Sequence, residues 1–210
     1  MLRKKRFNLL LLTVLCVSAL LFGITARQII RQQNEYRAAR DEYSDLRELA
    51  GADVSPLPDT PPNESNGIDF DALFSINPRT VGWIRLPDSN ISYPIVQGSD
   101  NWHYLHHTFS GRRNASGAVF LDFRDEPDFQ GTARIFAHNM RDGSMFGTLR
   151  NWNGDIITIY TPDGEVTEFA VTFRGAVSLA EVRVIEEFAL ITCVNGRPDL
   201  RFVVRAEKIH

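Results

Sequence analysis

The fold is decided by one stretch near the C-terminus, Phe188-Ala189-Leu190-Ile191-Thr192-Cys193. This apolar run has the composition of a buried β-strand and ends at a thiol. A short loop with a glycine and a proline follows, and Arg201 then opens a second β-type run, Phe202-Val203-Val204. If the two runs pair as neighbouring strands, the thiol and the guanidinium lie at the same end of one sheet.

Cys193 is therefore the candidate nucleophile. A thiol attacks as the thiolate, so it needs a fixed cation and a neighbour that handles protons. Arg201 supplies the cation, and the candidate proton carrier is His138, which follows the apolar run Ala133–Ala137. A lone cysteine is usually a small core residue. Here a thiol, an imidazole and a guanidinium each stand at the end of a strand-like segment, and this favours a catalytic site.

Composition limits the class of protein. The 210 residues can hold one ordinary domain with accessory segments, and a hydrophobic content of 43% is sufficient for a core. The formal net charge of −3 gives no reason to expect nucleic-acid binding. The second cysteine, Cys16, lies in an apolar segment near the N-terminus, so a disulfide with Cys193 is implausible.

The N-terminus has the pattern of a membrane anchor. A basic cluster, Arg3–Arg6, precedes the largely apolar segment Phe7–Ile24, which is long enough to span a bilayer and lacks a good cleavage site. We predict a single-pass signal anchor in the cell membrane, with a cytoplasmic N-terminus and everything after Thr25 outside the cell. A cleaved signal peptide, the alternative, gives the same external location.

The chain divides into four predicted segments. Residues 1–24 are the basic tail and the transmembrane helix, and residues 25–50 are a solvated stalk helix. A stripe with a seven-residue repeat runs along this helix and consists of Ile29, Tyr36, Tyr43 and Ala50, with Ala39 and Leu46 between them. Residues 51–67 contain four prolines and form a linker, and residues 68–210 form the catalytic domain.

The pattern after Ile68 is mainly β. Short β-type runs alternate with turn residues, and few helices intervene, so we predict a closed, eight-stranded barrel rich in antiparallel pairs. The expected strands are Val81–Leu86, Ile91–Val96, Gly117–Asp122, Thr132–His138, Asp155–Thr161, Glu165–Phe173, Glu186–Thr192 and Arg201–Lys208. The expected short helices are Ile68–Ile76, Asn101–His107 and Ser144–Trp152.

Two clusters could bind metal ions. His103, His106 and His107 have a spacing that can bind zinc, but no further ligands complete the set, so packing or surface roles are favoured. The acidic segment Asp122–Glu126, with Asp128 beyond it, could bind Ca²⁺, but a solvated loop is the preferred interpretation. We expect no metal and no cofactor.

Five motifs, in order, resemble the sortases, particularly those of class B. The resemblance covers Ile68 to Lys208. Its motifs are Asn77-Pro78 with Val81-Gly82-Trp83-Ile84; Ile91-Ser92-Tyr93-Pro94-Ile95-Val96-Gln97-Gly98; Asp100-Asn101 with Tyr104-Leu105 and Phe120-Leu121-Asp122; Ala137-His138-Asn139-Met140 with Asp142-Gly143-Ser144-Met145-Phe146-Gly147; and Leu190-x-Thr192-Cys193 with Arg201-Phe202-Val203-Val204.

This resemblance implies an eight-stranded sortase barrel and a cysteine transpeptidase. Cys193 would attack a C-terminal sorting signal of a substrate protein, and an amine of a cell-wall precursor or a pilin would resolve the thioacyl enzyme. His138 would be the acid and base, and Arg201 would bind the oxyanion or position the substrate. Thr192 would line the site, and Asn101 and Leu105 would contact the sorting signal.

The chain departs from the family pattern in two places. Ala189 stands where the family usually has threonine, and only fifteen residues lie between Phe173 and Ala189, where class B usually has a long helical insertion. We expect this segment to hold a turn at Gly175–Leu179 and a short strand or helical turn around Glu181–Ile185. The alternative functions are a catalytically weak, sortase-derived binding or scaffold protein and a thiol peptidase that uses water as the acceptor.

Overall fold

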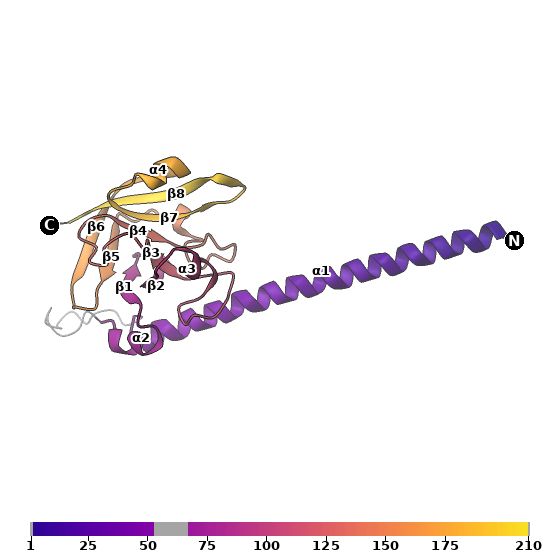
Figure 1. Ribbon diagram of the computed structural model, residues 1–210, viewed down its shortest axis with the longest axis horizontal. Helices are drawn as coiled ribbons and strands as arrows, with labels where there is room; N and C mark the ends of the chain where they lie inside the picture. Colours follow the sequence, from indigo (N-terminus) through magenta and orange to yellow (C-terminus); the bar gives the residue numbers. More distant parts are fainter. Residues whose placement is uncertain (1, 53–66, 210) are drawn as a thin grey trace. The chain divides into compact units, whose positions relative to one another are not determined.

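Eight strands close into a barrel in the part of the chain that the structure, a computed structural model, describes: residues 2–52 and 67–209, with side chains from residue 12 onward (Figure 1). The order around the barrel is β1-β2-β3-β4-β7-β8-β6-β5, and the predicted closed eight-stranded barrel is confirmed. The strands are β1 Thr80–Arg85, β2 Ser92–Gln97, β3 Val119–Leu121, β4 Ala133–Phe136, β5 Ile156–Tyr160, β6 Val166–Ser178, β7 Phe188–Val194 and β8 Arg197–Lys208.

Two of the strand pairs are parallel. β2 pairs with β3 and β4 pairs with β7 in this direction, and the other six neighbouring pairs are antiparallel. Parallel strands bury both faces, and the β4 and β7 positions Ile135 and Leu190 are fully buried side by side. The parallel pairing of β4 with β7 brings the C-terminal ends of these strands to the same edge, where His138 and Cys193 are found.

The loop between β7 and β8 is tighter than the sequence pattern indicated. β8 begins at Arg197 and not at Arg201, because Asn195-Gly196 makes the turn and Gly196 has a positive φ of 73°. Asn-Gly is a strong signal for a two-residue hairpin turn, and here Gly196 alone takes the positive φ, since Asn195 does not. The predicted neighbours are nevertheless correct, because Cys193 pairs with Arg201 across the two strands.

The helices within the barrel domain's chain from Ile68 onward are short, and the first of them begins with a side-chain cap. α2, Phe70–Ile76, starts at Asp69, whose Oδ1 accepts a hydrogen bond from the N–H of Ala72 at 2.9 Å. α3 is Trp102–His106, and a single 3₁₀ turn, η1, covers Leu149–Asn151. The expected helix at Ser144–Trp152 is limited to that turn, because Met145 has a positive φ of 54° and cannot start an α-helix.

The segment before the Cys193 strand contains one helical turn. β6 continues as far as Ser178, so the turn expected at Gly175–Leu179 is wrong; residues 175–178 pair with β8 instead. The helical turn α4, Leu179–Arg183, then leads to β7, close to the expected position. Ser178 and Glu181 form a reciprocal capping box at its start, which stabilises so short a helix.

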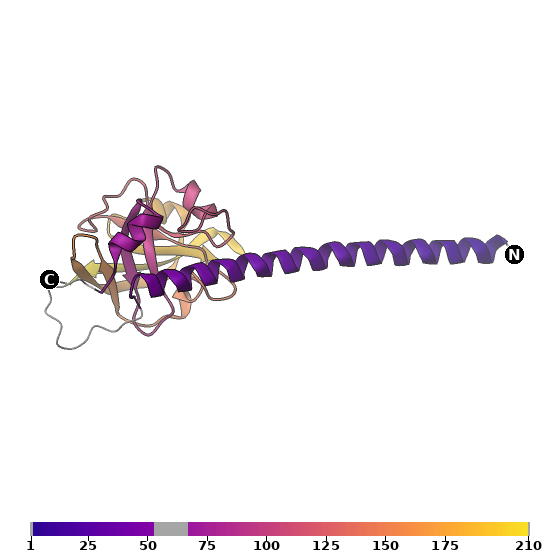
Figure 2. The same cartoon turned by 90° about the horizontal axis from the view of Figure 1, so that it is seen from below.

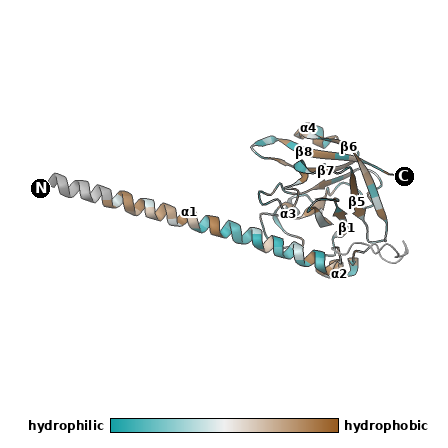
Figure 3. Ribbon diagram, turned by 180° about the vertical axis from the view of Figure 1, so that it is seen from behind, coloured by the Kyte–Doolittle hydropathy of each residue, from teal (hydrophilic) through white to brown (hydrophobic). Residues whose placement is uncertain are grey.

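α1, Leu2–Leu49, is one helix that belongs to two units, Met1–Ala38 and Ala39–His210. Its described part contains a window that is long and apolar enough to cross a membrane, coloured brown in Figure 3. The second unit begins at Ala39, earlier than the boundary near Ile68 that the sequence suggested. The expected linker, 51–67, lies almost entirely outside the described residues.

The predicted stripe on this helix divides between the two units. Ile29 is exposed, whereas Ala39, Tyr43, Leu46 and Ala50 are buried in the second unit. α2 follows beside the last turn of α1, where the N–H of Asp69 donates to the carbonyl of Ala50 (Figure 2). The end of the helix is therefore a packed element of the barrel domain and not a solvated stalk.

Candidate active site

A pocket of about 250 Å³ lies at the edge where β4, β7 and β8 meet α3. All six site residues predicted from the sequence line it. Its lining is Asn101, Leu105, Phe120, Phe136, Ala137, His138, Ile191, Thr192, Cys193 and Arg201. The lining is largely hydrocarbon, and the thiol, the imidazole and the guanidinium are polar groups within this small apolar site.

The strand ladders bring Cys193 to the other two groups. Cys193 is an exposed residue of β7 and lies directly opposite Arg201 of β8. On its other side β7 pairs with β4, and the pairing continues one step beyond the strand, where the N–H of Ala137 donates to the carbonyl of Ile191 at 3.3 Å. The backbone register thus fixes His138, Cys193 and Arg201 on three adjacent segments.

His138 is oriented by a backbone carbonyl. Its Nε2 lies 2.8 Å from the carbonyl oxygen of Leu105 in α3. A carbonyl can only accept, so Nε2 carries a proton and Nδ1 is the nitrogen that can gain or lose one at the pocket. Leu105 therefore serves the site through its main chain as well as through the side chain that lines the pocket.

The guanidinium of Arg201 is held by carbonyls of the first residues of its own strand, β8. Nη1 donates to the carbonyls of Pro198 at 3.0 Å and Leu200 at 2.8 Å. Within the described residues, Nε and Nη2 have no hydrogen-bond acceptor. A fixed cation with donors to spare, opposite a thiol, is suited to stabilise a thiolate or a developing oxyanion.

The polar groups of Thr192 and Asn101 are engaged inside the protein. The Thr192 hydroxyl donates to the carbonyl of Ala137 at 2.8 Å. The Asn101 side chain donates to Asp122 at 3.1 Å and accepts from the N–H of Phe123 at 3.1 Å. These contacts hold the walls of the pocket together, so substrate contact by either residue would come mainly from its hydrocarbon surface.

Sequence reasoning missed the role of Asn139. Its side-chain amide donates to the carbonyl of Cys193 at 2.8 Å. With the bond from Thr192 to Ala137, this contact fastens the residues on either side of His138 to Thr192 and to the carbonyl of Cys193. The signal was present, since Asn139 stands inside the quoted motif Ala137-His138-Asn139-Met140.

The acidic segment after β3 is not solvated at Asp122 and Asp125, so that interpretation is wrong there. Asp122 is fully buried, and Arg124 binds both of its carboxylate oxygens at 2.7 and 2.8 Å. Asp125 is buried and binds Arg134. Each carboxylate is neutralised by a guanidinium, which removes the basis for a Ca²⁺ site. The network braces α3 through the bond from Asn101.

Stability at low pH should depend on Asp122. Burial raises the pKa of its carboxyl group, but the hydrogen bonds from Arg124 and Asn101 outweigh burial, and the net pKa is below the ordinary 3.8. A depressed folded-state pKa gives stability that is complete above the unfolded-state value and is lost as pH falls below it. We expect the free energy of unfolding to fall from about pH 4 downward. In Asp122→Asn that decline should be shallower, as denaturant titrations at each pH will show; equal slopes would contradict this.

Two of the three clustered histidines, His103 in α3 and His107 at its C-terminal cap, contact each other. The rings of His103 and His107 stack with centroids 4.3 Å apart, and Nδ1 of His107 lies 2.8 Å from the carbonyl of His103. Across residues 2–52 and 67–209 no group of three or more histidine, cysteine or acidic side chains is placed to hold a metal ion.

Comparison with known proteins agrees with this geometry. The family described as "Sortase domain" matches residues 84–209. Sortase B of Listeria monocytogenes is 41% identical over 81 residues, covering 38% of this chain and 33% of that protein. Sortase B of Staphylococcus aureus is 28% identical over 151 residues, covering 71% and 59%. The chain thus spans about a third and three-fifths of these relatives.

The fold is also that of a solved class B enzyme. The S. aureus sortase B–substrate complex superimposes with a TM-score of 0.69 at 20% identity, covering 83% of this chain and 98% of that one. An identity this low speaks to the fold alone. The match to the family, however, extends over residues 84–209, which is more than half of the 210 residues, and on that ground the chain belongs to the sortase family.

Proposed function

We propose that this protein is a membrane-anchored cysteine transpeptidase that joins a substrate protein to an amine. The proposal is carried by one observation: Cys193, His138 and Arg201, which come from three segments of the barrel edge, line one small pocket. Membership of the sortase family, whose members are cysteine transpeptidases, supports the same chemistry. The substrate we infer is a protein with a C-terminal sorting signal.

The first half-reaction forms a thioacyl enzyme. The thiolate sulfur of Cys193 attacks the carbonyl carbon of the sorting signal, and the negative charge moves to the carbonyl oxygen, where the free donors of Arg201 stabilise it. When this tetrahedral intermediate collapses, the carbon–nitrogen bond breaks. Protonated His138 gives a proton to the leaving amine, and the C-terminal fragment departs.

The second half-reaction transfers the acyl group. An amine of a cell-wall precursor or a pilin attacks the thioacyl carbon, and neutral His138 removes a proton from the attacking nitrogen. A carbon–nitrogen bond forms, the carbon–sulfur bond breaks, and the Cys193 thiolate is restored. No oxidant, metal or cofactor is needed to balance either step.

The anchoring of the enzyme rests on the N-terminal helix. The apolar window in α1 is compatible with a membrane span, and the basic residues Arg3–Arg6 precede it. Positive charge before a span favours a cytoplasmic N-terminus, so the domain that carries Cys193 would be outside the cell. This location suits an enzyme that acts on surface proteins.

The test uses the full-length chain in detergent micelles, with Cys16→Ser to leave a single thiol. We incubate it with a library of extended peptides and look for a thioacyl adduct at Cys193 by mass spectrometry. Adding short amines, such as triglycine, should then yield a peptide–amine product. Hydrolysis without transfer would identify a thiol peptidase, and the absence of any adduct would favour a binding or scaffold protein.

Arg201 should not tolerate lysine. Arg201→Lys keeps the charge but loses the planar guanidinium. That group binds two backbone carbonyls through Nη1 and leaves Nε and Nη2 available as donors. We expect both Arg201→Lys and Arg201→Ala to lower kcat/KM by about 10²-fold or more, the scale for losing an oxyanion donor. Steady-state kinetics with the best peptide measure this. Near-normal activity of Arg201→Lys would exclude Arg201 from oxyanion stabilisation.

A further inference from the structure

The end of α1 reaches the active-site loops through one buried hydroxyl. Tyr43 is 3% exposed, and its hydroxyl donates to the carbonyl of Gly117 at 2.8 Å and accepts from the N–H of Phe109 at 3.2 Å. Gly117 and Phe109 lie at the two ends of the loop that joins α3 to β3. Burial and the nearby Glu42 charge raise the pKa of Tyr43 well above 10, so this hydroxyl stays protonated and can donate.

Gly117 lies against the ring of His138. A Cβ atom at this position would be 3.2 Å from Cδ2 of His138, 3.0 Å from the carbonyl oxygen of Leu105 and 2.6 Å from that of Tyr104. The φ of Gly117 is +57°, a further reason why glycine is needed here. Cδ2 adjoins Nε2 in the ring, so Gly117 and the Leu105 carbonyl together confine the Nε2 edge and leave Nδ1 toward the pocket.

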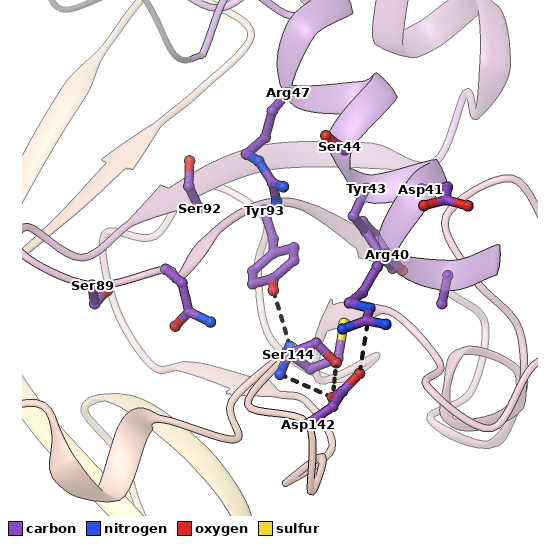
Figure 4. Close-up of a pocket in the computed structure, with 13 residues that line it drawn as sticks. Arg40, Asp41, Tyr43, Ser44, Arg47, Ser89, Ser92, Tyr93, Asp142 and Ser144 are labelled. Atoms are coloured by element: carbon purple, nitrogen blue, oxygen red, sulfur yellow. Dashed lines mark hydrogen bonds and ion pairs between the residues drawn. The ribbon is translucent and has the colours of Figure 1, made fainter. Parts of the chain in front are cut away.

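A second contact of Tyr43 connects it with the backbone around His138. Its ring meets that of Tyr93 edge to face, with centroids 5.3 Å apart. Figure 4 labels both side chains. The Tyr93 hydroxyl accepts from the N–H of Met145 at 3.0 Å, and Met145 forms a β-bridge with Asn139. The next residue, Phe146, donates its N–H to the carbonyl of His138 at 3.0 Å.

The neighbouring Glu42 holds the same α3–β3 loop at a different place. Its carboxylate accepts from the N–H of Ser110 at 3.0 Å and from Arg112 at 3.0 Å. Arg40, two residues earlier, lies 3.8 Å from Asp142 in the loop that follows His138 (Figure 4). Three side chains of one helical segment therefore fasten the two loops between which the imidazole is held.

We propose that Tyr43 is a positioning residue for His138, so that this one side chain of α1 belongs to the catalytic assembly. The inference rests on the proposed transpeptidase function for its kinetic consequence, although the positioning itself does not require substrate. The hydroxyl fixes Gly117, Gly117 and Leu105 fix the ring, and the ring presents Nδ1 to the thiol and to the amines. A misplaced general acid lowers the rate of the chemical step and leaves substrate binding largely intact.

The test is Tyr43→Phe, which removes only the hydroxyl, in the full-length chain in detergent micelles. We expect kcat to fall about tenfold and KM to change by less than about twofold. Labelling histidine with ¹³C gives a second readout without substrate. With only five histidines in the chain, the His138 ring signal can be assigned by its loss in His138→Gln, and it should shift in Tyr43→Phe.

A matched control separates positioning from general stability. Leu46→Ala truncates a buried side chain on the same face of α1 and should lower the melting temperature at least as much as Tyr43→Phe. It should leave kcat and the His138 signal unchanged at temperatures well below melting. Tyr36→Phe makes the identical substitution on the same helix outside the barrel domain and should change nothing.

Glu42→Gln gives an independent variant should Tyr43→Phe fold poorly. It loosens the α3–β3 loop at Ser110 and Arg112 and should move both readouts in the same direction by a smaller amount. An unchanged kcat and an unchanged His138 signal in folded Tyr43→Phe and Glu42→Gln would overturn the proposal. If the wild-type chain transfers nothing, the proposed function fails, while the His138 signal still decides whether Tyr43 positions the ring.

Discussion

Cys193→Ala and His138→Ala will each reduce transpeptidation by at least about 10³-fold. Without Cys193 no thioacyl bond can form. Without His138 the leaving amine lacks an acid and the incoming amine lacks a base, although the thiol remains opposite Arg201. Rates of peptide–amine product formation, followed by chromatography in the full-length chain, measure both losses.

The losses of activity in Cys193→Ala and His138→Ala should not be additive. The thiol and the imidazole act in one sequence of steps, so a double variant should be about as inactive as Cys193→Ala alone. Because Cys193 is exposed and His138 is only partly buried, melting temperatures should stay near that of the wild type. Cys16→Ser is the control for the second thiol and should retain full activity. Residual transfer in Cys193→Ala within tenfold of the wild type would remove Cys193 as the nucleophile.

The three reactive residues at the barrel edge could be predicted because the sequence signals that mark them are local. Each of the three reactive residues follows or opens an apolar β-type run, and such runs report both their own length and the place where they end. Adjacent runs in sequence usually pair, which placed Arg201 opposite Cys193. The parallel pairing of β4 with β7, which are far apart in sequence, was not predicted; His138 is a candidate because it too follows an apolar run.

The supports of the site could not be predicted, because they are contacts between distant segments. The carbonyl that binds His138 belongs to Leu105, and the glycine beside the ring is held by Tyr43, 74 residues earlier. Nothing in the local pattern of residues 25–50 distinguishes a stripe that packs on a domain from one that faces solvent. Only the fold shows that this stripe is buried from Ala39 onward and exposed at Ile29.

The charged network behind the pocket escaped prediction for a related reason. Acidic residues in sequence suggest a solvated loop or a cation site, and the arginines that neutralise them are found only in the fold. Arg134 stands in β4, where an apolar residue would be expected, and it is buried. It lies 3.9 Å from Asp122 and forms two side-chain hydrogen bonds with Asp125, whose carboxylate also accepts the N–H of Arg134.

Arg134→Met should therefore be the most destabilising single change in this region. It leaves the buried carboxylate of Asp125 without its guanidinium, and breaking a buried pair from one side costs about 3–5 kcal/mol. For a chain of this size that corresponds to a fall in melting temperature of about 6–20 °C. Thermal unfolding followed by circular dichroism on the full-length chain in detergent measures it.

Two variants show whether the uncompensated charge is the cause. Arg124→Met removes the half-exposed partner of Asp122, which keeps Arg134 at 3.9 Å and the amide of Asn101, so it should cost less than Arg134→Met. Adding Asp125→Asn to Arg134→Met removes the stranded charge and should recover part of the lost melting temperature. Because Asp122 also binds Asn101 at the start of α3, the structural disturbance caused by Arg134→Met should reach the carbonyl of Leu105 that holds His138. Activity of Arg134→Met should then fall even at temperatures where the variant is folded. A stability loss equal in the two single variants would show that burial of the pair is not what matters.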